Sequence, residues 1–174
     1  TTPPDADGRV HITLSDAEQS IQRKALSYNE DDYYDFLSAF CKSLRGSDAN
    51  AALYYAMRLI EGGCDPMLVA RRLVVHSAED VGMADPRALQ MATSAMYALE
   101  KIGYPEGLLP LSEAIVYVCE AVKSGSVKNA MFAAKEDAVK VRDDGVPPYL
   151  KDNSFGSRED KARSAEYKYP HDYG

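Results

Sequence analysis

The sequence of 174 residues contains no tryptophan, three histidines and three cysteines. The cysteines, Cys41, Cys64 and Cys119, are odd in number and far apart, which excludes a disulfide framework and a zinc site built on paired cysteines. We therefore expect three reduced thiols, buried in a protein of the cytosol. No apolar run approaches the roughly 20 residues that span a membrane.

Basic charge is also scarce. The chain has 20 lysines and arginines against 27 acidic residues, so its formal net charge is −7. An acidic chain is a poor non-specific ligand for nucleic acid, because release of counterions from phosphates requires clustered cations. Any contact with DNA would therefore be local, or come from other parts of a longer protein. The polar, proline-containing residues 1–9 show no secretory signal, and we expect them to be an interdomain linker.

The motifs of nucleotide and acyl-transfer chemistry are missing. No Gly-Lys pair occurs, so the chain lacks a phosphate-binding P-loop. It also lacks the Gly-x-Gly-x-x-Gly and Gly-x-Ser-x-Gly patterns. We expect no catalytic residue, no cofactor-binding residue and no metal ligand here, and predict that this chain alone is not an enzyme.

What is present is a regular succession of helix signals. Ser15 and Glu18 form a capping box, and an aspartate precedes a proline at Asp65-Pro66 and again at Asp85-Pro86. Asp48 supplies another cap, and Gly62 and Gly103 are predicted to end helices. Apolar spacing predicts helices at about residues 15–26, 33–44, 49–61, 66–78, 86–102, 111–122 and 126–141. The run 115–118 has strand propensity, but polar residues with helical spacing flank it, so we predict helix there.

The apolar stripes predict which helices form the core. The helix from Pro66 is apolar nearly all round, so we expect it to be central and buried. The helix from Pro86 should bury Ala88, Ala92, Ala95, Leu99 and Ile102. The last long helix should turn Val127, Ala130, Met131, Ala134, Ala138 and Val141 inward.

The chain changes character at its end. Val146-Pro147-Pro148 cannot continue an α-helix. The last residues are rich in tyrosine, which suits a half-apolar, half-wet contact, so we expect this tail to dock on the body. We predict an all-α, compact multi-helix domain of about six to seven helices, followed by an irregular C-terminal tail.

Two groups of side chains are candidate sites. Lys42, Arg45, Arg71 and Arg72 are basic residues on two predicted helices. They either cap helices and form ion pairs, or contact DNA or an acidic partner. Arg72, His76 and Glu79 have helical spacing on an otherwise apolar helix, which indicates either an internal ion pair or an interface pair. His76 has no second histidine four residues away, so a zinc site is disfavoured.

Several segments together resemble one family: residues 42–48, 51–55, 65–66, 70–74, 77–89 and 167–172. The most specific are Ser-Ala-Glu-Asp at 77–80 and Ala-Asp-Pro-Arg-Ala-Leu at 84–89. They resemble the C-terminal region of the RarA/MgsA AAA+ ATPases, relatives of the Werner-helicase-interacting protein and, more remotely, of clamp loaders.

The resemblance implies a function for the chain. In this family an N-terminal AAA+ module binds ATP and magnesium, a helical lid follows, and the C-terminal domain forms a homotetramer. Residues 1–27 would be a linker and the end of the lid, 28–144 a helical oligomerisation domain and 145–174 the tail. The whole protein would act on DNA at stalled replication forks in bacterial cytoplasm, associated with the nucleoid, with single-strand-binding protein as a partner.

A different class of function stays open. The chain could be a monomeric helical adaptor that docks a partner, such as the acidic tail of single-strand-binding protein. Such a peptide would need a basic groove, and Lys42, Arg45, Arg71 and Arg72 are the candidates for it.

Overall fold

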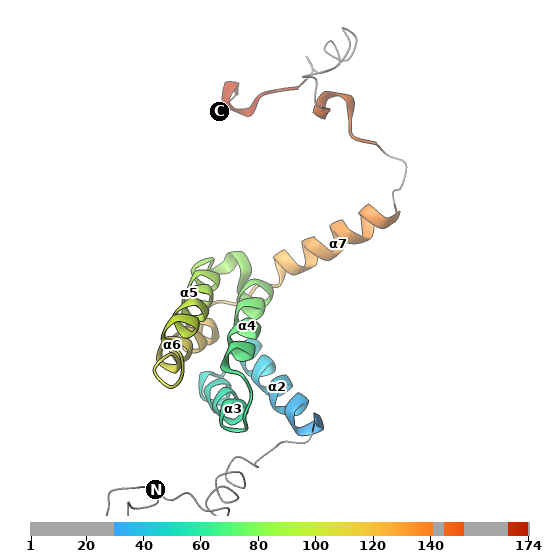
Figure 1. The fold of residues 1–174 in the computed structure, drawn as a ribbon. Helices are drawn as coiled ribbons and strands as arrows, with labels where there is room; N and C mark the ends of the chain where they lie inside the picture. The colour runs from blue at the N-terminus through green and yellow to red at the C-terminus, as the bar shows by residue number, and fades with distance from the viewer. Residues whose placement is uncertain (1–29, 141–144, 152–166, 174) are drawn as a thin grey trace, which may run out of the picture. The chain divides into compact units, whose positions relative to one another are not determined.

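A computed structural model describes residues 30–140, 145–151 and 167–173. Within these ranges the chain forms six α-helices and no strand, which confirms the predicted all-α class (Figure 1). The predicted capping box at Ser15 and the helix after it lie outside the described residues. None of the helices that the structure describes is long and apolar enough to cross a membrane.

The helices follow one another with short connections. They are α2 (Glu30–Arg45), α3 (Ala49–Glu61), α4 (Pro66–His76), α5 (Arg87–Ile102), α6 (Leu108–Glu120) and α7 (Ser126–Lys140). A π-helical turn, η1 (Ser77–Val81), and a 3-10 turn, η2 (Gly82–Ala84), connect α4 to α5. Two further 3-10 turns, η3 (Pro148–Leu150) and η4 (Pro170–Asp172), lie in the tail.

The chain divides into two compact units. The first ends at Met131 and holds α2 to α6 with the first residues of α7. The second begins at Phe132 and holds the rest of α7 and the two turns of the tail. The division lies inside α7, whereas the sequence placed the end of the helical domain at residue 144; that boundary stays a prediction.

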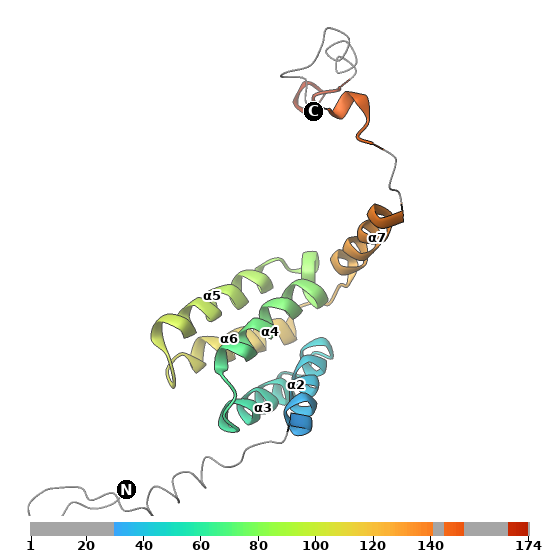
Figure 2. The same ribbon diagram turned by 45° about the vertical axis from the view of Figure 1, so that its right-hand side comes forward.

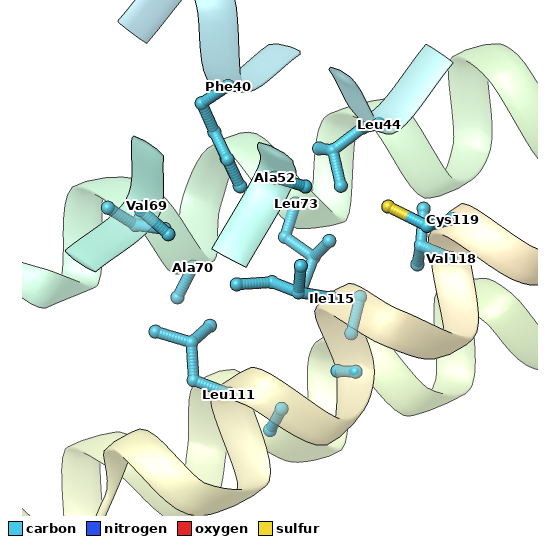
Figure 3. Packing of buried hydrophobic residues seen from close by; sticks show 14 of the residues in the cluster. Phe40, Leu44, Ala52, Val69, Ala70, Leu73, Leu111, Ile115, Val118 and Cys119 are labelled. Carbon is cyan, nitrogen blue, oxygen red and sulfur yellow. The ribbon is translucent and has the colours of Figure 1, made fainter. Parts of the chain in front are cut away.

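The first unit is built around α4, which is central as predicted but buried on one side only, since Val75 is 48% exposed. This helix contacts α2, α3, α5 and α6 (Figure 2). Its Leu73 points toward Ile115 of α6, and Phe40 and Leu44 of α2 enter the same cluster (Figure 3). Burying side chains of this size is the main favourable contribution to folding, at about 1.5–3 kcal/mol each.

Two predicted helix starts have the expected caps. The Asp48 carboxylate accepts a hydrogen bond from the Ala51 amide at 2.9 Å, and the Asp65 carboxylate accepts one from the Met67 amide at 2.9 Å. The third predicted start, at Asp85-Pro86, is shifted, because α5 begins at Arg87, one residue later than predicted. Asp85 Oδ1 still accepts a hydrogen bond from the Arg87 amide at 3.1 Å.

Two details of the α5–α6 hairpin differ from prediction. Helix α6 begins at Leu108, so Pro110 lies within its first turn, where a backbone N–H is not needed. Ile102 is 57% exposed instead of buried. Ile102 is the last residue of α5, and the turn after it packs on Leu99 instead: a Cβ placed on Gly107 would lie 2.8 Å from Leu99 Cδ1.

The prediction for α7 was right about the helix and wrong about its burial. The predicted inward side chains Val127, Ala130, Met131, Ala134 and Ala138 are all exposed, while Val141 lies outside the described residues. An apolar stripe shows that a helix has a face to bury. It does not show whether the covering surface comes from the same chain.

Two smaller expectations have mixed outcomes. The three thiols are free, but only Cys119 is buried, while Cys41 and Cys64 are partly exposed. Burial raises the pKa of the Cys119 thiol to about 11, so it stays protonated. In the tail, Tyr149, Tyr167, Tyr169 and Tyr173 are between 43% and 70% exposed, and docking of the tail stays a prediction.

Candidate functional site

The four predicted basic residues lie on α2 and α4. Lys42 and Arg45 are in the last turn of α2, and Arg71 and Arg72 are exposed on α4. Burial raises the pKa of the Cys41 thiol, and the charges of Arg72 and Arg45 oppose that rise. Arg71 is paired with Asp65 at 3.6 Å.

A buried carboxylate joins two of these helices. Asp80, on the π-helical turn η1, accepts a hydrogen bond from Arg45 Nε at 2.9 Å and lies 2.7 Å from His76 Nδ1. The Asp80 side chain is 7% exposed and that of His76 9%. A buried carboxylate with two such partners connects the end of α2 firmly to the end of α4.

The electrostatics of Asp80 follow from those contacts. Burial raises the pKa of its carboxyl, but hydrogen bonds with His76 and Arg45 outweigh burial, so the pKa is lowered. Asp80 is therefore ionised at neutral pH and compensates the Arg45 charge.

Glu79, beside Asp80, connects α2 to α7. Its Oε1 atom lies 3.6 Å from Arg45 and 3.3 Å from Lys128 Nζ. The predicted stripe of Arg72, His76 and Glu79 is thus only partly brought together. His76 and Glu79 belong to one polar group, which we call the junction: Arg45, His76, Glu79, Asp80 and Lys128.

Arg72 takes no part in the contacts that hold the junction. Arg72 and His76 both lie on α4, but Arg72 is exposed there, whereas the buried His76 ring contacts Asp80 of the π-helical turn.

Residues 124–128, which end the α6–α7 connection and begin α7, pack on the π-helical turn; we call them the strap. The Ser124 amide donates a hydrogen bond to the Asp80 carbonyl at 2.7 Å. Gly82 has a φ of +53°, and a Cβ there would lie 3.2 Å from Val127 Cγ2. Glycine at position 82 therefore allows both the turn and the close approach of the strap.

Lys123 fixes the end of α6 just before the strap. Its ammonium group donates to the carbonyl oxygens of Val118, Cys119 and Ala121 at 2.8, 2.8 and 2.7 Å. A cation at this position satisfies the unpaired carbonyls of the last turn and interacts well with the helix dipole. Burial lowers the pKa of the Lys123 ammonium.

A second polar group joins α5 to α6. Arg87 donates through Nε and a terminal nitrogen to the two Asp85 oxygens, at 2.8 and 3.0 Å. Tyr117 Oη donates to Asp85 Oδ2 at 2.8 Å. The hydrogen bonds from Arg87 and Tyr117 lower the pKa of Asp85 to about 2.

The described surface carries many large apolar side chains. On α7 these are Val127 (42% exposed), Met131 (54%), Phe132 (56%) and Val139 (64%). On the first unit the most exposed are Tyr34, Tyr54, Met83, Tyr97, Ile102, Tyr104, Leu109 and Val122. Clusters of exposed apolar side chains mark surfaces that bind other molecules.

Two observations concern metal and nucleotide binding. Across the described ranges, no group of three or more histidine, cysteine and acidic side chains could hold a metal ion. The chain also contains no Gly-Lys pair for a phosphate loop. We therefore derive no chemical step through ATP or magnesium here.

Sequence reasoning missed Asp80, Lys123, Lys128 and Gly82 as parts of the junction and strap. A signal existed for Asp80, since it lies four residues after His76, a spacing at which helical side chains meet. None existed for Lys128, which lies 49 residues from its partner Glu79.

The chain is similar to proteins of bacteria and of a eukaryote. The family described as "MgsA AAA+ ATPase C terminal" matches residues 46–174. The chain is 43% identical to the replication-associated recombination protein A of Bacillus subtilis, over 99% of the chain and 41% of that protein. It is 41% identical to the Escherichia coli K12 protein of the same name, over 87% of the chain and 34% of that protein.

A eukaryotic relative is more distant. The ATPase WRNIP1 of Dictyostelium discoideum is 36% identical over 93% of the chain, which spans 19% of that protein. The chain thus spans less than half the length of these relatives. The family match covers most of the sequence, including the Ser-Ala-Glu-Asp segment of the junction, and the chain belongs to the MgsA AAA+ ATPase C-terminal family.

Proposed function

We propose that this chain is the oligomerisation domain of a longer AAA+ ATPase that acts in replication-associated recombination at stalled forks. The observation that carries the proposal is α7. This helix of 15 residues has no buried residue, although it presents Met131, Phe132 and Val139. Isolated helices of about 12–15 residues are marginal in water, so α7 needs a covering surface.

The distribution of apolar side chains on α7 favours more than one covering surface. With about 100° between successive residues, Met131, Ala134 and Ala138 share one side of the helix. Phe132 and Val139 share another side, about 120° away. A helix that is apolar on two sides fits a position between neighbouring subunits, as in the proposed homotetramer.

The proposal is tested by the mass of the full chain measured with light scattering. We expect an oligomer for the wild type, and a shift toward monomer for Met131→Glu and Phe132→Glu. Glu136→Gln is the matched control on the same helix and should keep the wild-type mass. If both apolar variants keep the wild-type mass, α7 is not the assembly contact.

The role of such an assembly follows from multivalency. A tetramer presents several ATPase modules to one DNA substrate, which raises the effective concentration of each module at its site. ATP and magnesium would bind upstream of this chain, in the AAA+ module. DNA and single-strand-binding protein are proposed partners of the full-length protein. The names of the relatives support replication-associated recombination as the setting.

A second candidate is a monomeric adaptor for an acidic peptide. The observation in its favour is that Arg71 and Arg72 are both exposed on α4 in an otherwise acidic chain. An acidic C-terminal peptide of single-strand-binding protein should then bind the chain, and Arg72→Glu should weaken binding. Arg45→Glu is less informative, because Arg45 is bonded to Asp80. No binding to the wild type ends this alternative.

A further inference from the structure

We propose that the strap is a salt-sensitive latch, which holds the first turn of α7 on the π-helical turn and so regulates assembly through α7. The regulatory consequence rests on the proposed function, whereas the latch itself does not. The Ser-Ala-Glu-Asp-Val-Gly segment, residues 77–82, is the part of the body that the latch closes on.

Among the described residues, three contacts of different kinds join the strap to the π-helical turn. They are the hydrogen bond from the Ser124 amide to the Asp80 carbonyl at 2.7 Å, the ion pair of Lys128 with Glu79 at 3.3 Å, and the approach of Val127 to Gly82. Segments with few buried contacts open locally at a lower free energy than the core does. The strap is therefore a separate opening unit beside the α4-centred core.

The two ends of the strap differ in how firmly they are held. On one side Lys123 donates three hydrogen bonds to backbone carbonyls at the end of α6. On the other side the hold depends on Lys128 and Glu79, whose side chains are 34% and 30% exposed. Opening therefore moves α7, while α6 keeps its place in the core.

Salt acts on the latch through that ion pair. The Debye length is about 8 Å at physiological ionic strength and about 3 Å at 1 M, so a partly exposed pair weakens as salt rises. Glu79 also faces Arg45, at 3.6 Å, and the Arg45 guanidinium is bonded to Asp80 at 2.9 Å. When Lys128 moves away, Glu79 keeps Arg45 as a partner. Opening of the latch therefore leaves no unpaired carboxylate.

Hydrogen exchange at the Ser124 amide tests the latch in the full chain. In Lys128→Met this amide should exchange about two- to fivefold faster than in the wild type, the range expected for a partly exposed ion pair. Amides of α5 and α6 should keep their wild-type rates, which separates opening of the strap from loss of overall stability. Lys135→Met, an exposed lysine one heptad further along α7, is the matched control and should leave Ser124 unchanged.

The salt dependence of Ser124 exchange is the second test of the latch. Raising NaCl from 0.05 to 0.5 M should speed Ser124 exchange in the wild type and in Lys135→Met, and have little effect in Lys128→Met. Equal exchange of Ser124 in all three proteins at both salt concentrations would overturn the latch. The mass of the same samples tests oligomerisation separately. If the wild type is a monomer but its Ser124 exchange responds to salt and to Lys128→Met as expected, the proposed oligomerisation is wrong and the latch stands.

Discussion

Asp80 is a single residue on which three segments of the chain converge. Its carboxylate contacts Arg45 of α2 and His76 of α4, and its carbonyl accepts from Ser124 of the strap. Hydrogen bonds to charged groups contribute more than neutral ones, and a buried group that loses its partner is costly. One residue therefore determines how the ends of α2 and α4 and the start of the strap meet.

Replacing Asp80 should measure that contribution. Asp80→Asn keeps the shape of the side chain and removes its charge, so the free energy of unfolding should fall by about 1–3 kcal/mol. Urea denaturation measures the change. Glu113→Gln, an exposed carboxylate on α6, should stay within about 0.5 kcal/mol of the wild type. An Asp80→Asn midpoint equal to that of the control would show that the junction carries no stability.

The lowered pKa of Asp85 predicts that the stability of the fold depends on pH. Its pKa is about 2 in the folded chain, below the unfolded value of about 3.9. A depressed pKa stabilises the fold above the unfolded value, and this contribution is lost as pH falls from about 4 to 2. In thermal denaturation against pH, the stability difference between wild type and Asp85→Asn should therefore shrink over that window.

A conservative variant tests whether the hydrogen bonds to Asp85 cause its lowered pKa. Tyr117→Phe removes one of the two side-chain donors and leaves Arg87 in place. Its loss of stability at neutral pH should be smaller than that of Asp85→Asn, and should shrink over the same pH window. A stability difference that stays constant from pH 5 to 2 in both variants would contradict the assignment.

At the scale of helices, the hairpin of α5 and α6 depends on a turn that accepts only glycine. Gly107 is buried, and a Cβ there would lie 2.7 Å from the Gly103 carbonyl oxygen and 2.8 Å from Leu99 Cδ1. Gly107→Ala should therefore cost about 1–3 kcal/mol of unfolding free energy through overpacking. Gly145→Ala, where a Cβ meets nothing within 4 Å, is the control. Equal denaturation midpoints would refute this tight packing.

The helices were predictable because their signals are local. Caps at Asp48 and Asp65 and the stops at Gly62 and Gly103 lie where the sequence places them. The π-helical turn after His76 had no such signal, and neither did the exposure of Arg72 on α4. The contacts of Lys128 with Glu79 and of Tyr117 with Asp85 join distant positions, which no periodicity predicts.

At the scale of the whole molecule, the sequence predicted that α7 has an apolar side but placed that side in the wrong environment. Val127 and Met131 are exposed, as are Phe132 and Val139. Obligate assemblies bury on the order of 2,000 Å² or more per contact, and are more hydrophobic than transient ones. An apolar helix with no buried residue in the part of the chain that the structure describes is consistent with such an assembly.

The absolute mass of the full chain in solution, followed by sedimentation over a dilution series, tests the central claim most directly. The chain has a mass of 19.1 kDa. The account predicts a species close to four times that mass, which dissociates on dilution and is lost in Phe132→Glu. A wild-type chain that stays a monomer at the highest concentration would contradict the assignment of this domain to assembly.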